Sequence, residues 1–144
     1  VAAILGLAAL VGQSGLGILI GNEVLALAPL SPDTPIRSYA SILGLSTLLN
    51  FVVTANGVPA IFTPLAQSLA SASGFPLLSV LMIQVLGFST PLLPYQASPI
   101  VLAMEMGKIP FAAVLRLSLA IALITFVVLA PINYGWYVFL GWLP

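Results

Sequence analysis

TANGVP, residues 54–59, interrupts an uncharged run of sequence, Ser38–Met104. The Asn56-Gly57 pair favours a tight turn with positive φ. Pro59 favours the start of a new helix, because proline fits the first helical turn and disrupts an interior one. We therefore expect one helix to end before this stretch and a second helix to return after it. In a bilayer, such broken backbone is tolerated only where protein or a water-filled cavity covers it, which makes the turn a candidate binding site.

The composition of the chain is typical of a membrane protein. Of its 144 residues, 61% are hydrophobic and 4% are charged, and the mean hydropathy is +1.24. About a quarter of the residues in a soluble domain are charged, so these few charges cannot cover a water-soluble surface. We predict an all-α polytopic membrane protein in a bacterial-type plasma (inner) membrane. The net charge of zero gives no reason to expect nucleic-acid binding.

The chain contains no cysteine and no histidine. Disulfides, thiol chemistry and imidazole metal sites are therefore excluded. The expected membrane spans also hold no paired carboxylates, so we predict that the chain is not an enzyme and carries no cofactor. The sequence starts at Val1 without a basic leader segment, so we expect no signal peptide and a piece of a longer protein that begins within a helix.

Three segments are expected along the chain. Residues 1–35 are predicted to form a scaffold transmembrane helix and a connecting loop. Residues 36–106 are predicted to form a central membrane segment, with a helical hairpin over 37–73 and a broken helix over 76–106. Residues 107–144 are predicted to form the final transmembrane helix, which ends in an interfacial aromatic cluster.

The two arms of the hairpin are short. Residues 37–53 and 58–73 give about 17 and 16 residues, near the lower limit for crossing a membrane. Either the hairpin is re-entrant and its tip stops inside the bilayer, or two full-span helices meet at the surface. Polar side chains on both sides of the turn favour the re-entrant hairpin, since a surface turn needs none of them: Ser46, Thr47, Asn50, Thr54, Asn56, Thr63 and Gln67.

Residues 76–104 are too long and too broken for one ordinary helix. Pro91, Pro94 and Pro99 fall within nine residues, and each removes a backbone donor and clashes with the preceding turn. We predict two half-helices, over about 77–88 and 98–106, joined by an unwound segment. A surface loop between two helices is the alternative, but both halves fall well short of spanning a membrane.

A last helix is expected after the charged turn at Glu105–Pro110. Pro110 opens this helix, which we expect from Phe111 to about Ala130. Pro131 would kink or end it. Lys108 and Arg116 place the preceding turn in the cytoplasm by the positive-inside rule.

The hairpin tip and the unwound segment are expected to meet near the middle of the membrane. Their backbone carbonyls, hydroxyls and amide oxygens suit Na⁺, and helix N-termini near Val58 and Ser98 favour an anion. Secondary transporters with broken helices use the same logic. Neither broken segment contains a carboxylate, which disfavours a proton relay there. The predicted ion- and substrate-binding residues are Thr54, Ala55, Asn56, Gly57, Ser89, Thr90, Gln96, Ala97 and Ser98.

These motifs give the chain a family resemblance over nearly its whole length. Gln13-Ser14-Gly15-Leu16, the Thr-Ala-Asn tip and the broken stretch from Pro94 to Pro99 occur in an order similar to the C-terminal half of the divalent-anion/sodium symporters. These are citrate-transporter-like permeases of the ion transporter superfamily. The resemblance implies that a Ser-Asn-Thr motif at the tip binds sodium and a substrate carboxylate. Asn56 matches that motif, whereas Gly57 stands where the family has Thr.

The resemblance implies one half of an inverted repeat, with the N-terminal half of the protein as its partner, in a homodimer embedded in the lipid bilayer. It also implies that residues 36–106 belong to a moving transport domain and that the first helix belongs to a fixed scaffold. The expected function is sodium-coupled symport of a di- or tricarboxylate or similar anion by an elevator-like mechanism. An arsenite or Na⁺/H⁺ antiporter of the same superfamily is one alternative. A membrane anchor subunit without transport activity is another, which the concentration of polar residues at the helix breaks disfavours.

Overall fold

The computed structural model describes residues 30–53 and 55–143. This part of the chain folds into α-helices with short 3₁₀- and π-helical turns, and it contains no strand. The all-helical prediction is confirmed there. The scaffold helix predicted within residues 1–35 falls almost entirely outside the described residues.

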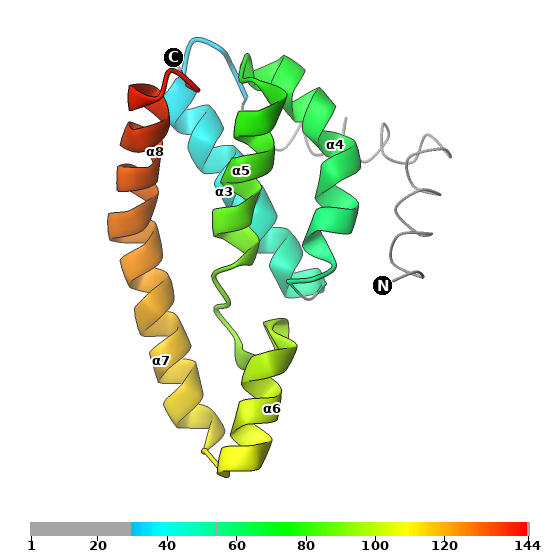
Figure 1. Cartoon of the computed structure of the whole chain (residues 1–144), viewed down its shortest axis with the longest axis vertical. Helices are drawn as coiled ribbons and strands as arrows, with labels where there is room; N and C mark the ends of the chain where they lie inside the picture. The colour runs from blue at the N-terminus through cyan, green and yellow to red at the C-terminus, as the bar shows by residue number, and fades with distance from the viewer. Residues whose placement is uncertain (1–29, 54, 144) are drawn as a thin grey trace.

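The predicted hairpin is present as two antiparallel helices. Helix α3 (Pro35–Val52) runs toward the tip and helix α4 (Val58–Ser73) returns from it, as Figure 1 shows. Pro35 opens α3, and the buried Ser38 fixes the turn before it, because its hydroxyl donates to Ser31 O at 2.8 Å and accepts from Ser31 N at 3.0 Å. The start and end of α4 agree with the sequence prediction.

The backbone at the tip corrects one expectation. Gly57 has φ −86° and ψ −27°, in the right-handed helical region, whereas the sequence analysis expected positive φ at Asn56-Gly57. The reason is that Gly57 already belongs to the first turn of α4, where its carbonyl accepts from Ala60 N at 3.1 Å and from Ile61 N at 3.4 Å. A left-handed residue at this position would turn that carbonyl away from the helix.

The positive φ occurs at the other end of α4. Gly74 has φ +73° and caps the C-terminus of α4, the conformation in which glycine is favoured. The chain then bends by 118° into helix α5 (Leu77–Phe88). Helix α5 packs between α3 and α4, so the three helices form one compact body.

The predicted broken helix is also present. Helix α5 ends at Phe88, and helix α6 (Ser98–Gly107) begins at Ser98. Residues 89–97 between them are unwound except for one 3₁₀ turn, Pro94–Gln96. Helix α6 extends away from the three-helix body, and it buries none of its residues.

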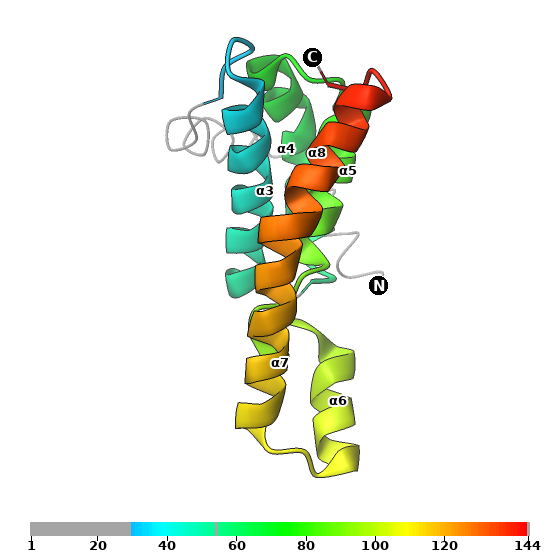
Figure 2. The ribbon, with the colours of Figure 1, turned by 90° about the vertical axis from the view of Figure 1, so that its left-hand side faces the viewer.

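A long helix runs beside both halves. It comprises α7 (Phe111–Ile124), the π-helical turn Thr125–Leu129 and α8 (Ala130–Phe139). Pro131 therefore does not end the helix, and the predicted aromatic residues from Tyr134 to Phe139 lie on α8. Figure 2 shows α8 beside α3 and α7 extending down toward the level of α6. At 1.5 Å per residue, the 29 residues of this helix span about 43 Å.

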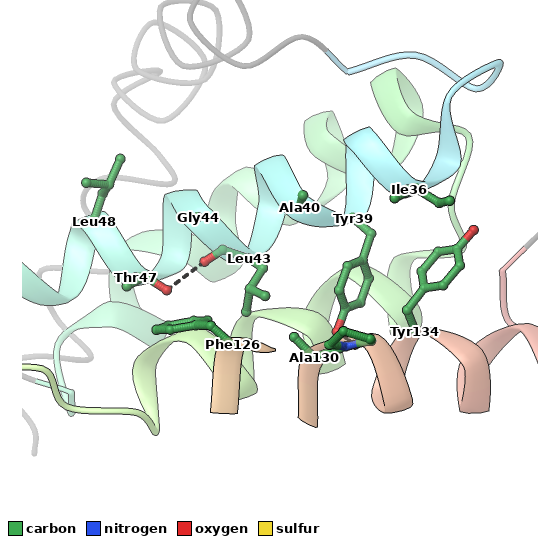
Figure 3. Close-up of a pocket in the computed structure, with 11 residues that line it drawn as sticks. Ile36, Tyr39, Ala40, Leu43, Gly44, Thr47, Leu48, Phe126, Ala130 and Tyr134 are labelled. Carbon is green, nitrogen blue, oxygen red and sulfur yellow. Dashed lines mark hydrogen bonds between the residues drawn. The ribbon is translucent and has the colours of Figure 1, made fainter. Parts of the chain in front are cut away.

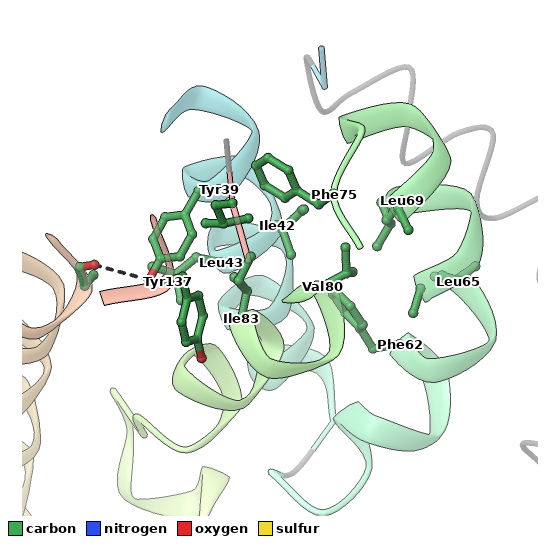
Figure 4. Close-up of a cluster of buried hydrophobic side chains, with 14 of the residues drawn as sticks. Tyr39, Ile42, Leu43, Phe62, Leu65, Leu69, Phe75, Val80, Ile83 and Tyr137 are labelled. Carbon is green, nitrogen blue, oxygen red and sulfur yellow. Dashed lines mark hydrogen bonds between the residues drawn. The ribbon is translucent and has the colours of Figure 1, made fainter. Parts of the chain in front are cut away.

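The hydrophobic core lies in the upper half of the molecule, between α3, α4, α5 and α8 (Figure 4). Phe62, Leu65 and Leu69 point from α4 toward Val80 on α5, whereas Ile83 of α5 lies next to Leu43 and Tyr137. Tyr137 from α8 and Tyr39 from α3 close the other side. This core holds the hairpin against α5 and thereby positions its tip.

Helices α3 and α5 approach closely at Gly87. A Cβ atom built on Gly87 would lie 2.7 Å from both Cβ and Oγ of Ser46 and 3.0 Å from Leu43 O. The Ser46 hydroxyl donates to Gln84 O at 2.7 Å across the same contact. Close approach therefore requires glycine at this position and a small polar residue opposite it.

We predict that Gly87→Ala destabilises the full-length protein by roughly 1–3 kcal/mol, the usual cost of overpacking a close contact. Thermal unfolding of the purified protein in detergent measures the effect. Gly44→Ala on α3 is the matched control, because a Cβ there meets nothing within 4 Å. Equal unfolding temperatures for the two variants would contradict the close packing of α3 against α5.

Candidate functional site: the junction of the hairpin tip and the helix break

The hairpin tip, Ala55–Gly57, lies against the helix break, residues 89–97. The Ala55 backbone N–H donates to Gln96 O at 2.9 Å, which joins segments about forty positions apart in the sequence. The Tyr95 hydroxyl donates to Phe51 O at 3.1 Å and adds a second link between the break and the end of α3. The two broken segments therefore meet, as the sequence analysis expected, and we call this region the junction.

Gln96 holds the junction together with its side chain. Its Oε1 accepts from Leu92 N at 2.6 Å and from Leu93 N at 2.7 Å, which satisfies two donors that the unwound backbone leaves without helical partners. Its Nε2 donates to Asn50 O at 2.9 Å, at the last turn of α3. Gln96 is fully buried, so its carboxamide both stabilises the open break and ties the break to the hairpin.

Asn50 makes the next contact in this network. Its Nδ2 donates to Phe88 O at 3.1 Å, at the C-terminus of α5, where carbonyls lack intrahelical partners. Its Oδ1 is buried and accepts no hydrogen bond from residues 30–53 or 55–143. A buried amide oxygen without a partner is rare in proteins and calls for an explanation such as a bound water or ion. Asn50 thus offers one free acceptor beside the junction.

The structure places the predicted residues of the tip in different environments. Thr54 lies outside the described residues. Ala55 and Gly57 are half-buried, whereas Asn56 between them is exposed. Asn56 therefore has its side chain accessible next to the break, and Ala55 contributes its backbone N–H.

The predicted residues of the break divide in the same way. Gln96 and Thr90 are buried, Ala97 is half-buried, and Ser89 and Ser98 are exposed. The Thr90 hydroxyl donates to a backbone oxygen in the last turn of α5 at 2.8 Å. Gln96 is the residue of this set that directly contacts the hairpin, and Ser98 starts α6 at the edge of the junction.

Two helix N-termini face the junction from opposite sides. Helix α4 starts at Val58 and runs up from the tip, and α6 starts at Ser98 and runs down from the break (Figure 1). Each N-terminus carries a partial positive charge from its backbone N–H groups. The backbone carbonyl oxygens of Asn50 on α3 and Phe88 on α5 lie in the same region. The junction therefore offers both donors and acceptors on a neutral background.

The charged side chains of the described residues lie away from the junction. Asp33 and Arg37 flank the start of α3, whereas Glu105 and Lys108 flank the turn between α6 and α7. Figure 1 shows these two places at opposite ends of the molecule. Arg116 is exposed in the second turn of α7. In residues 30–53 and 55–143, no three His, Cys, Asp or Glu side chains gather as a metal site.

Asn50 and Tyr95 are not among the predicted binding residues. Asn50 was recognisable as an amide inside an apolar helix, but its pairing with Phe88 depends on how α3 packs against α5. Tyr95 stands next to Gln96, but its own residue type did not distinguish it from an interfacial aromatic residue. Its hydroxyl contact with Phe51 O depends on the path of the break.

No protein-family model, curated protein or solved structure matches this chain. The family resemblance described above therefore stays a prediction, and the junction itself is the basis for functional inference.

We predict that Gln96→Leu strongly destabilises the full-length protein. The substitution removes the acceptor of the half-buried Leu92 and Leu93 N–H groups and one donor to the carbonyl of Asn50. A polar group that stays desolvated without its partner costs about 1–3 kcal/mol. Gln67→Leu on the exposed face of α4 is the control, and it should leave the unfolding temperature nearly unchanged. Limited proteolysis should also cut residues 89–97 faster in Gln96→Leu. If both variants melt alike, Gln96 does not hold the junction.

Proposed function

We propose that this chain is the membrane-embedded part of a sodium-coupled secondary transporter for small anions. The observation that carries the proposal is the hydrogen bond between Ala55 N–H at the hairpin tip and Gln96 O in the helix break, 2.9 Å long. It brings together two interruptions of apolar helices in a region without charged side chains. Unwound backbone at membrane depth is tolerated where it is buried in protein or lines a cavity, and transporters use such places for binding.

The distribution of side chains supports a bilayer around the described part of the chain. The helix from Phe111 to Phe139 is long and apolar enough to cross a membrane. Large apolar side chains on it are exposed, among them Leu123 at 65% and Val127 at 63%. Polar side chains such as Asn50 and Gln96 are fully buried. Apolar side chains outside and polar side chains inside are what a hydrocarbon solvent favours.

The depth of the tip supports a re-entrant hairpin. The last turns of α3 lie beside Phe126, near the middle of the long helix, because Thr47 and Leu48 line a groove together with this residue. If that helix spans the bilayer, the tip stops inside it. Two full-span helices would instead end near the charged turn that connects α6 and α7.

The coupling ion is proposed from the chemistry of the junction. Hard cations prefer oxygen ligands, and the junction supplies backbone carbonyls, the exposed amide of Asn56 and the free Oδ1 of Asn50. Carboxylates, which a proton-coupled site would use, are not present in residues 55–57 or 89–97. The convergent N-termini of α4 and α6 favour an anionic substrate next to the cation.

We predict that Asn56→Ala in the full-length protein abolishes sodium-driven uptake without reducing expression, because it removes the exposed amide at the tip. Uptake into proteoliposomes is measured with labelled succinate, citrate, sulfate and arsenite, with and without an inward sodium gradient. Gln67→Ala, at an exposed amide on α4 distant from the tip, is the control and should transport normally.

The results of this experiment distinguish symport from antiport and test the role of the Asn56 amide. Sodium-driven uptake of one anion by the wild-type protein supports symport and names the substrate class. Uptake that ignores sodium but follows a pH gradient would favour an antiporter or a proton-coupled relative. Normal sodium-driven uptake by Asn56→Ala would remove the tip amide from the binding site.

A further inference from the structure

An open groove runs along α3, with α8 and the π-helical turn before it as the opposite wall (Figure 3). Ile36 and Tyr134 lie at one end of the groove, and Leu48 and Phe126 lie at the other. Its volume is about 640 Å³, within the range of roughly 300–1,000 Å³ that ligand sites occupy. The groove is therefore large enough to hold a small molecule or part of a lipid.

The lining of the groove is apolar, and its polar groups are used within the protein. The Thr47 hydroxyl donates to Leu43 O at 2.9 Å, and the Tyr39 hydroxyl donates to Asn133 Oδ1 at 2.9 Å. Gly44 adds space, because a Cβ atom there would meet nothing within 4 Å. Water bound in this groove would find few of the polar partners that it needs, whereas a hydrocarbon chain needs none.

The groove has the length of one leaflet. From Ile36 to Leu48, α3 rises by about 18 Å, and half of the hydrocarbon core of a bilayer is about 15 Å. Phe126, at the far end of the groove, lies near the middle of the apolar helix Phe111–Phe139. In a bilayer that this helix spans, the groove runs from one interface to the membrane centre. One acyl chain follows this course, whereas a helix of a second copy would cross both leaflets.

Charged side chains lie at the interface end of the groove. Arg37 is exposed and stands three and seven residues before Ala40 and Gly44, which both line the groove. This spacing places Arg37 on the same face of α3. Its guanidinium is suited to binding a phosphate. Asp33 is exposed in the turn before α3, so this end carries both signs of charge and complements a headgroup with a phosphate and an ammonium group.

We propose that the groove binds one acyl chain of a zwitterionic phospholipid, phosphatidylethanolamine, whose phosphate pairs with Arg37. The groove is continuous with the apolar outer surface, because Ile36 and Leu48 at its two ends are 68% and 64% exposed. A lipid can therefore enter from the side. The inference rests on the bilayer location in the proposed function and is independent of the transported ion and substrate.

Photolabelling of the full-length protein tests the acyl-chain site. The protein is reconstituted with phosphatidylethanolamine that carries a diazirine on one acyl chain, and mass spectrometry locates the adducts after irradiation. We expect adducts at Ala40 and Phe126 in the groove, and their loss in Gly44→Leu, which fills it. Gly135→Leu is the matched control, because Gly135 is exposed outside the groove and also has nothing within 4 Å of a Cβ. It should keep the adducts.

Native mass spectrometry tests the headgroup contact. The protein is extracted from vesicles with equal amounts of phosphatidylethanolamine and phosphatidylglycerol, and we expect phosphatidylethanolamine to be retained in excess. Arg37→Gln should lower this retention by roughly two- to fivefold, the range for an exposed charge pair. Arg116→Gln removes an exposed arginine on α7 and should have no effect. Equal retention of the two lipids, or unchanged retention in Arg37→Gln, would overturn the headgroup assignment.

The photolabelling also separates this inference from the proposed function. Leu123 and Val127 are exposed on the long helix and should be labelled wherever the protein lies in a bilayer. If they are labelled and the groove is not, residues 1–29 or a second copy cover the groove and the lipid site is wrong. If neither is labelled, the bilayer location fails as well.

Discussion

The carboxamide of Gln96 is the interaction on which the rest of the junction depends. An unwound segment in an apolar protein exposes backbone donors that must find partners. Gln96 Oε1 accepts hydrogen bonds from two of these donors. The same side chain donates to α3, and the same residue accepts from Ala55 through its own carbonyl. One glutamine therefore keeps the break open and fixes the hairpin tip against it.

Much of the helix pattern was predictable because proline and glycine mark the helix ends. Pro59, Pro76 and Gly74 bound α4 and α5 where the sequence analysis placed them, since a proline starts a helix easily and continues one poorly. Pro131 left two outcomes open in the sequence. The helix continues through Pro131 with a π turn before it, an outcome that the proline alone does not specify.

The contacts between segments were less predictable than the segments themselves. That the tip and the break meet could be expected, because both carry polar groups that an apolar environment cannot satisfy. The partners could not be assigned, since Asn50 with Phe88 and Gly87 with Ser46 depend on the register of α3 against α5. For the same reason Gln96, expected to bind an ion or substrate, is occupied with hydrogen bonds to its own chain, and Asn50 retains the free oxygen.

The contact between the tip and the break is tested most directly by cross-linking in native membranes. Ala55 N–H donates to Gln96 O at 2.9 Å, and Ala97 follows Gln96 directly, so we expect cysteines at positions 55 and 97 to come within the reach of a disulfide. We predict rapid oxidation of this pair in the full-length protein, and little oxidation when Ala103 on α6 replaces Ala97. A failure of the first pair to cross-link, or equal cross-linking of the two pairs, would contradict a junction formed by the hairpin tip and the helix break.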